Sequence, residues 1–424
     1  MASSLSDPVK LPCGVVFPNR LVKAAMAELM AGSEHTPTPE LIEVYNQWGQ
    51  GGWGAILTGN VQVDINHLGS PFDPALHGEY TGKDNNFLLV ETWSKYAEAC
   101  QQHGPPSIVQ ICHPGRQSFR IAGNRGIFAS TIAPSPIPLV MGDGFLERLL
   151  SPLLFPAPRE MTQADIDTVT RQFVDTARLM ADSGFSGVQL HGAHGYLIDQ
   201  FLNPKTNHRT DAYGGSAQNR SKFVLDILKQ TRAVVPSTFC IGIKLNSADH
   251  SSATFEDTMT QIGLLVSAGI DFLEVSGGTY EDPKMMSTKT HPSEEEKSKS
   301  SRTAAREAFF LEFATAVRTR YPSLVLMLTG GFRTRAGAEA ALRQNACDLV
   351  GIARPAAVDT RFARLLLDES VAEEEARLPL GKAPAPWGVG WIPIRILGAG
   401  LESSYYAGQI KRIGKGLKTF APGL

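Results

Sequence analysis

The fold is decided by one unit of the chain, TQADIDTVTRQFVDTARLMADSGFSGVQLHGA (residues 162–193). Its first part carries apolar residues three and four positions apart, such as Ile166, Val169 and Phe173, which is the spacing of one face of an amphipathic helix. Its second part, SGVQLHGA (186–193), is a short and mostly apolar run. Parallel strands that are buried on both faces have this character. The unit therefore predicts a helix that leads into a buried strand.

The same alternation extends along most of the chain. The predicted strands are LVKAAM (21–26), GAILTGN (54–60), SIVQICH (107–113), SGVQLHGA (186–193), CIGIKLN (240–246), FLEVSGG (272–278), LVLMLTGG (324–331) and LVGIAR (349–354). The predicted helices are 38–48, 89–104, 162–184, 216–235, 254–269, 304–321, 334–346 and 359–369. Eight parallel strands with helical crossovers predict an α/β protein with a closed (β/α)8 TIM barrel. A doubly wound open sheet remains the alternative, because the sequence does not give the strand order.

Long connections and an extension decorate this barrel. A segment rich in Pro and Ser, about 114–161, follows the third strand, and loops of this length tend to be lids or binding loops. A charged connection, 281–303, follows the sixth strand, and a C-terminal extension covers about 370–424. No internal repeat or second core is evident, so we expect a single domain over residues 1–424.

Composition narrows the class of protein. The chain is 42% hydrophobic and 19% charged, with a formal net charge of −2. This balance gives no reason to expect nucleic acid or a membrane surface as a partner. The five cysteines are scattered without CxxC spacing, so neither a disulfide framework nor an iron–sulfur cluster is indicated. With no signal peptide pattern and no long apolar run, the expectation is a cytoplasmic protein.

Polar residues stand at the ends of the apolar strands, where the active sites of TIM barrels lie. They include Gln110, His191, Lys244 and Arg354. The loops after the seventh and eighth strands, TGGFRT (329–334) and GIARP (351–355), offer glycines and an arginine, which suit a phosphate. The alternative is a tight turn made by the glycines and a surface ion pair made by Arg354. No dinucleotide or P-loop fingerprint is present, which favours a mononucleotide or a sugar phosphate.

The stretch HGAHGY (191–196) allows three interpretations. His191 and His194 could bind a metal, but no carboxylate ligands are evident at the other strand ends, and Lys244 would oppose a dication. They could fill a core, although two polar residues at a strand end fit a core poorly. Two imidazole donors with a phenol two residues further suit the polarisation of a carbonyl and protonation of the neighbouring carbon.

At these residues the chain resembles the Old Yellow Enzyme family of FMN-dependent ene-reductases. The resemblance rests on PNRLVKAAM (18–26), VQICHPGRQ (109–117), TGGFRT and VGIARP, and above all on HGAHGYLIDQFLNPKTNHRTDAYGGSAQNR (191–220). It implies FMN at the C-terminal ends of the strands and NADPH or NADH as hydride donor. The residues implied to bind FMN are Ala25, Met26, Ala27, Asn60, Gln110, Lys244, Gly330, Gly331, Gly351 and Arg354.

The resemblance also implies a reaction. Reduced FMN delivers hydride to an α,β-unsaturated carbonyl compound, whose oxygen is held by His191 and His194, and Tyr196 protonates the product. No metal is expected at this site, and a homodimer is possible. Ala27 departs from the threonine or cysteine that is frequent in the family. Three alternatives stay open: a flavin-dependent isomerisation or oxidation in a biosynthetic pathway, a metal-dependent barrel lyase or hydrolase, and a flavin-binding protein without turnover.

Overall fold

The barrel predicted from the sequence is present. The computed structural model describes the chain except residues 1–3, 143, 248–253, 277–311, 385–394 and 424. Eight parallel strands close on one another in chain order. They are β3 (Leu21–Lys23), β4 (Ala55–Gln62), β5 (Ser107–Cys112), β8 (Gly187–Gly192), β9 (Cys240–Asn246), β10 (Phe272–Ser276), β11 (Leu326–Thr329) and β12 (Leu349–Ile352). The open-sheet alternative is therefore excluded.

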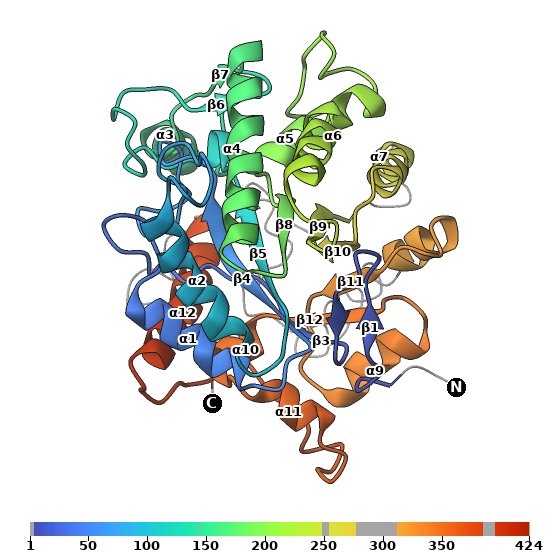
Figure 1. Ribbon diagram of the computed structural model, residues 1–424. Helices are drawn as coiled ribbons and strands as arrows, with labels where there is room; N and C mark the ends of the chain where they lie inside the picture. The colour runs from blue at the N-terminus through green and yellow to red at the C-terminus, as the bar shows by residue number, and fades with distance from the viewer. Residues whose placement is uncertain (1–3, 143, 248–253, 277–311, 385–394, 424) are drawn as a thin grey trace.

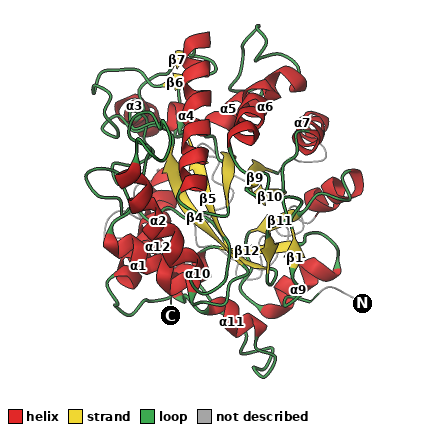
Figure 2. Cartoon of the chain, viewed as in Figure 1, coloured by secondary structure: helices red, strands yellow, loops and turns green. Residues whose placement is uncertain are grey.

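Helices surround the strands, as a parallel barrel requires (Figure 2). They are α1 (Pro39–Gly49), α2 (Phe87–Gln101), α4 (Gln163–Asp182), α6 (Ala217–Val234), α7 (Phe255–Ser267) and α9 (Arg335–Arg343). Residues 312–320 are helical as well. Local signals set the helix starts: Thr38 caps α1 ahead of Pro39, and Thr162 forms a capping box with Asp165 at α4. These starts agree with the predicted ones.

The segment after β12 differs from its prediction. We expected one helix over 359–369, but the chain forms α10 (Arg354–Val358) and α11 (Phe362–Leu367). Pro355 lies in the first turn of α10, where its fixed φ favours helix and its missing N–H costs nothing. The backbone then breaks at Asp359, whose carboxylate accepts from the N–H of Arg361 at 2.8 Å. The predicted helix therefore began too late and missed the break.

An N-terminal hairpin closes the floor of the barrel. The strands β1 (Val9–Lys10) and β2 (Val16–Phe17) pair antiparallel, and the hairpin lies beside β11 and β12 in Figure 1. Its apolar side chains form one cluster with strand residues such as Ala55, Cys240 and Phe272. The hairpin therefore fills the end of the barrel opposite the polar strand ends.

The long insertion and the C-terminal extension both contain regular structure. Within 114–161 lie η1 (Gly115–Gln117), α3 (Phe145–Leu154) and the paired short strands β6 (Ile132–Ala133) and β7 (Arg159–Glu160). The extension contains α12 (Arg395–Gly414), which contacts α1 and α10. The charged connection 281–303 lies outside the described residues. In the part of the chain that is described, no helix is long and apolar enough to cross a membrane.

Candidate active site

His191, His194 and Tyr196 meet at the C-terminal end of β8. His191 is the second-last residue of the strand, and Tyr196 is the N-cap of α5 (Leu197–Leu202). The ring centroid of His191 lies 4.4 Å from that of Tyr196 and 5.0 Å from that of His194. Between them the backbone turns sharply, with left-handed φ angles of 60° at His194 and 77° at Gly195. The turn places two imidazoles and a phenol around one point.

Buried polar side chains hold this turn in place. Asp199 accepts from the N–H of Gly195 at 2.7 Å, and Asn246 donates to the same carboxylate oxygen at 2.9 Å. Gln200 donates to the carbonyl of Gly195 at 2.6 Å, and Gln117 of η1 donates to the carbonyl of His194 at 2.9 Å. The turn is thus fixed from β9, from α5 and from the long insertion.

Both histidines are neutral at neutral pH. Burial, helped by His194 and Lys244, holds the pKa of His191 well below its usual value. Burial and the charge of Lys244 lower the pKa of His194 to about 3. The Nδ1 atom of His191 accepts from the N–H of Ala193 at 3.3 Å, so its proton is on Nε2. His194 Nε2 lies 2.9 Å from the hydroxyl of Ser276. Neutral imidazoles can donate hydrogen bonds without carrying a charge, and whether Nε2 of His194 donates to Ser276 or accepts from it depends on the tautomer.

A chain of buried polar side chains crosses the barrel below the histidines. Gln110 donates to Gln189 at 2.6 Å, and Gln189 donates to Glu274 at 2.7 Å. Glu274 in turn lies 3.2 Å from the ammonium group of Lys244. Gln110 and Lys244 each lie two residues before the end of their strand.

Gln189 and Glu274 were not predicted from the sequence as part of the site. A carboxylate in the apolar strand FLEVS, and glutamine alternating with histidine in VQLHG, are the signals that could have identified them. Buried charges in proteins are paired, so an isolated glutamate in a buried strand calls for a cationic partner. Lys244 is that partner.

A second histidine cluster follows β4 and β5. Burial opposes ionisation of Asp64, but the neighbouring imidazoles of His113 and His67 hold the pKa of its carboxyl well below the usual range. His67 donates at 2.6 Å, and His113 Nε2 lies 3.7 Å from the same oxygen. The N–H of Gly115 donates to His113 Nδ1 at 3.0 Å, which puts the imidazole proton on Nε2. A metal on Nε2 would need that proton on Nδ1, so this cluster is suited to bracing the 113–117 turn rather than to binding a metal.

The loop after β11 borders a cavity of about 290 Å³. Thr329, Gly330, Gly331 and Arg333 line it together with residues along α9, from Gly337 to Ala341. A helix N-terminus beside glycine-rich backbone is an anion-binding arrangement. Arg354 follows β12, but its guanidinium donates to Glu402 of α12 at 2.8 Å. Arg354 therefore makes an ion pair, which was the alternative to phosphate binding in the sequence interpretation.

Comparison with known proteins agrees with this geometry. Residues 4–370 match the NADH:flavin oxidoreductase / NADH oxidase family. The chain belongs to this family. It is 42% identical over 400 residues to the NADH-dependent flavin oxidoreductase iliE of Hypocrea jecorina, covering 94% of this chain and 98% of the relative.

Two solved structures share the fold. The Old Yellow Enzyme homologue of Zymomonas mobilis superposes with a TM-score of 0.67 and 21% identity, over 90% of this chain and 98% of that chain. Morphinone reductase superposes with a TM-score of 0.68 and 20% identity, over 93% of this chain and 96% of that chain. The barrel inferred from the sequence is thus that of the Old Yellow Enzyme homologues.

As a member of the flavin oxidoreductase family, the protein is an oxidoreductase with FMN as cofactor and a nicotinamide as hydride donor. The mouth of the barrel fits such a cofactor. Asn60 Oδ1 and Thr329 Oγ1 are buried with no hydrogen-bond partner among the described residues. A Cβ at Gly351 would lie 2.0 Å from Thr329 Oγ1, so the backbone at this point admits no side chain. Ala25, Met26 and Ala27 follow β3 on the same side, Ala27 exposed and the other two half-buried.

Proposed function

We propose that the protein reduces the activated C=C bond of α,β-unsaturated carbonyl compounds with hydride from a reduced nicotinamide. The observation that supports this most is the convergence of His191, His194 and Tyr196 around one point at the barrel mouth. Two neutral imidazoles can donate hydrogen bonds to the carbonyl oxygen of the substrate without forming an ion pair with it. The name of the Hypocrea jecorina relative supports NADH as the donor.

Each side chain then has a distinct role. FMN, when bound, supplies the hydride. His191 and His194 hold the carbonyl oxygen, where negative charge builds up in the transition state, so their hydrogen bonds lower the barrier more than they tighten binding of the ground state. Tyr196 lies within 3.4 Å of the amide nitrogen of Asn60 and gives its proton to the α-carbon. Lys244 places a positive charge below the site to favour an anionic reduced flavin.

The cofactor-binding set is part of the same proposal. Backbone at Ala25, Met26 and Ala27 and the side chains of Asn60, Gln110 and Lys244 would contact the flavin ring. The phosphate would bind at Gly330, Gly331, Gly351 and Arg354. The cavity lined by Gly330 and Gly331 supports the phosphate position at these two glycines, and the unpartnered acceptor of Asn60 supports its contact with the ring. Arg354 already pairs with Glu402, and this carboxylate neutralises part of the positive charge of the guanidinium. We therefore expect Arg354 to bind the phosphate more weakly than an unpaired arginine would.

The test measures the two half-reactions separately, with oxygen excluded from the solution. NADH or NADPH should bleach the flavin of the purified protein, and a cyclic enone should restore its colour with formation of the saturated ketone. His191→Ala and His194→Ala should each weaken binding of phenolates, which mimic the enolate, while flavin content stays unchanged. Asn66→Ala, in a surface loop outside the proposed site, serves as the control.

Two outcomes would contradict the proposal. Reduced flavin that no enone, maleimide or nitroalkene reoxidises would leave the isomerase or oxidase reading in its place. Loss of a stoichiometric metal from the His191 variant, with phenolate affinity unchanged, would favour the metal-dependent alternative.

A further inference from the structure

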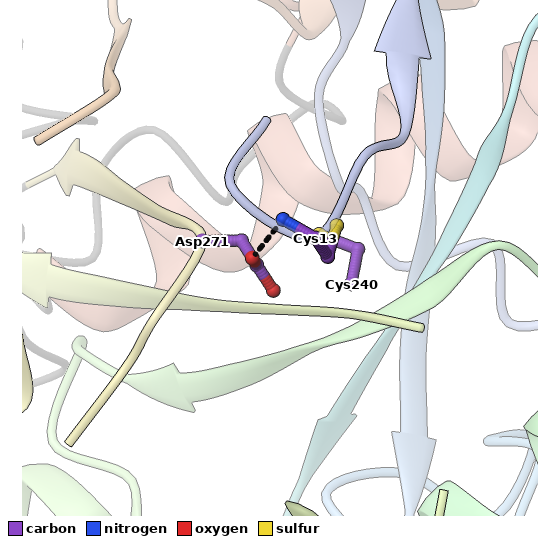
Figure 3. Close-up of side chains that lie close together, drawn as sticks. All are labelled: Cys13, Cys240 and Asp271. Carbon is purple, nitrogen blue, oxygen red and sulfur yellow. Dashed lines mark hydrogen bonds between the residues drawn. The ribbon is translucent and has the colours of Figure 1, made fainter. Parts of the chain in front are cut away.

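Two cysteines from distant parts of the chain meet at the floor of the barrel. Cys13 lies in the turn between β1 and β2, and Cys240 is the first residue of β9 (Figure 3). Cys240 is fully buried, whereas Cys13 is half-buried and reachable from solvent. This end of the barrel is opposite the proposed active site, so the pair has no part in the reaction derived above.

The two thiols lie close together. Their sulfur atoms and a carboxylate oxygen of Asp271 all lie within 4.8 Å of one another. The neighbouring Cys240 thiol lowers the pKa of the Cys13 thiol, against the opposing effects of burial and of the Asp271 carboxylate. Burial raises the pKa of Cys240 well above its usual value. One accessible thiol that ionises more readily therefore faces one buried thiol that stays protonated.

Asp271 does not make this cluster a metal site. Its Oδ1 accepts from the N–H of Cys13 at 2.9 Å, and its Oδ2 accepts from the N–H of Ile241 at 2.7 Å. Arg232 donates to Oδ2 at 2.5 Å as well. The carboxylate is thus committed, and the guanidinium would repel a cation. What Asp271 does is fix the backbone of Cys13 against β9.

We propose that Cys13 and Cys240 are a redox pair that closes to a reversible disulfide when the protein meets hydrogen peroxide. The Cys13 thiolate attacks one peroxide oxygen and forms a sulfenic acid, releasing hydroxide. The Cys240 sulfur then attacks the sulfenic sulfur, and the hydroxide that leaves takes the Cys240 proton and departs as water. The hydroxide released in the first step takes up the proton that Cys13 lost on ionisation, which gives the second water. In total the two thiols lose two electrons and two protons, and peroxide is reduced to two molecules of water.

The expected consequence is a clamp on the hairpin. The disulfide would join the β1–β2 turn to β9 and close a loop of more than 200 residues between Cys13 and Cys240. A cross-link over such a span removes much conformational freedom from the unfolded chain. It would also hold the β1–β2 hairpin, whose apolar side chains fill the floor of the barrel, in place. The flavin end of the barrel would not move.

The experiment uses the full-length holoprotein, reduced first with dithiothreitol and then treated with peroxide in slight excess. The intact mass should fall by the mass of two hydrogen atoms, and a proteolytic digest should contain one peptide pair joined through Cys13 and Cys240. The unfolding temperature should rise by roughly 2–5 °C. Dithiothreitol should reverse both changes, and the flavin spectrum should stay the same.

Variants test whether the disulfide forms between Cys13 and Cys240 and not at another cysteine. Cys13→Ser and Cys240→Ser should each abolish the loss of mass and the rise in unfolding temperature. Cys347→Ala is the matched control, because Cys347 is buried elsewhere and burial raises the pKa of its thiol to about 12. Oxidation of Cys13 to a sulfinic acid with Cys240 still free would overturn the proposal. Stoichiometric zinc binding that Cys13→Ser removes would overturn it too.

Discussion

At the scale of single residues, burial decides what the site can do. His191 and His194 are kept neutral by desolvation and by the nearby charge of Lys244, so neither is protonated near neutral pH and both are free of charge for the proposed role as hydrogen-bond donors. Tyr196 is buried as well, and its ring packs edge-on against the ring of His191 with an interplanar angle of 72°. Chemistry at this site therefore depends on the position of N–H and O–H groups rather than on net charge.

Tyr196→Phe should separate the two half-reactions. The phenol acts only after hydride has left the flavin, so reduction by NADH or NADPH should keep its normal rate. Reoxidation by an enone should slow about 10²- to 10⁴-fold, the usual contribution of a general acid. Phenylalanine keeps the ring contact with His191, which preserves the fold. Stopped-flow absorbance of each half-reaction measures both rates. Reoxidation at the wild-type rate would mean that another acid or bulk water supplies the proton.

At the scale of elements, strands were easier to predict than the segments between them. The β8 run VQLHG is short, buried and ends in glycine, and the observed bounds of the strand agree with the prediction within one residue at each end. The hairpin strands β1 and β2 have two residues each, too few for any periodicity to show. The break between α10 and α11 depends on local hydrogen bonds at Asp359, which apolar spacing does not report.

The candidate site shows the same limit. His191, His194 and Tyr196 were found because they lie together in the sequence. Glu274 was missed because its partners, Lys244 and Gln189, come from other strands and meet it only when the barrel closes. Sequence patterns thus identified the residues that point to a function, but not the buried network that supports them.

The turn that carries the site should respond to pH through Asp199. Burial raises the pKa of Asp199 to about 6, although Gly195 and Asn246 donate hydrogen bonds to it. A carboxyl with a raised pKa in the folded state stabilises the protein fully below its unfolded pKa, and this contribution is lost as the pH rises through about 6. The shift from the ordinary value corresponds to about 3 kcal/mol. Asp199→Asn keeps the acceptor oxygen and removes the titration.

We therefore expect Asp199→Asn to match the wild type in stability at pH 4 and to exceed it at pH 8. Urea unfolding at both pH values measures the difference. Both proteins keep Asp73, whose pKa burial raises to about 7, so the comparison isolates Asp199. A difference between the two proteins that is equal at pH 4 and pH 8 would show that Asp199 does not titrate in this range.

At the scale of the whole molecule, the two ends of the chain complete the barrel. The β1–β2 hairpin fills its floor, and α12 covers α1 and α10 from the opposite end of the sequence (Figure 1). Tyr406, Ile410 and Ile413 of α12 belong to the main hydrophobic core. The described part of α12 is thus packed into the main core, although the family match ends at residue 370.

Ile410→Ala tests whether the extension unfolds with the barrel. Ile410 is fully buried, so its truncation leaves a cavity and should cost about 2–5 kcal/mol of unfolding free energy. Leu417→Ala in the same segment is the matched control, because Leu417 is 50% exposed and should cost far less. Urea unfolding followed by fluorescence and by circular dichroism measures both variants. If α12 is part of the cooperative core, Ile410→Ala shifts one common transition to lower urea. If the midpoint of that transition does not move, or α12 unfolds in a separate early step, the barrel is stable without its C-terminal helix.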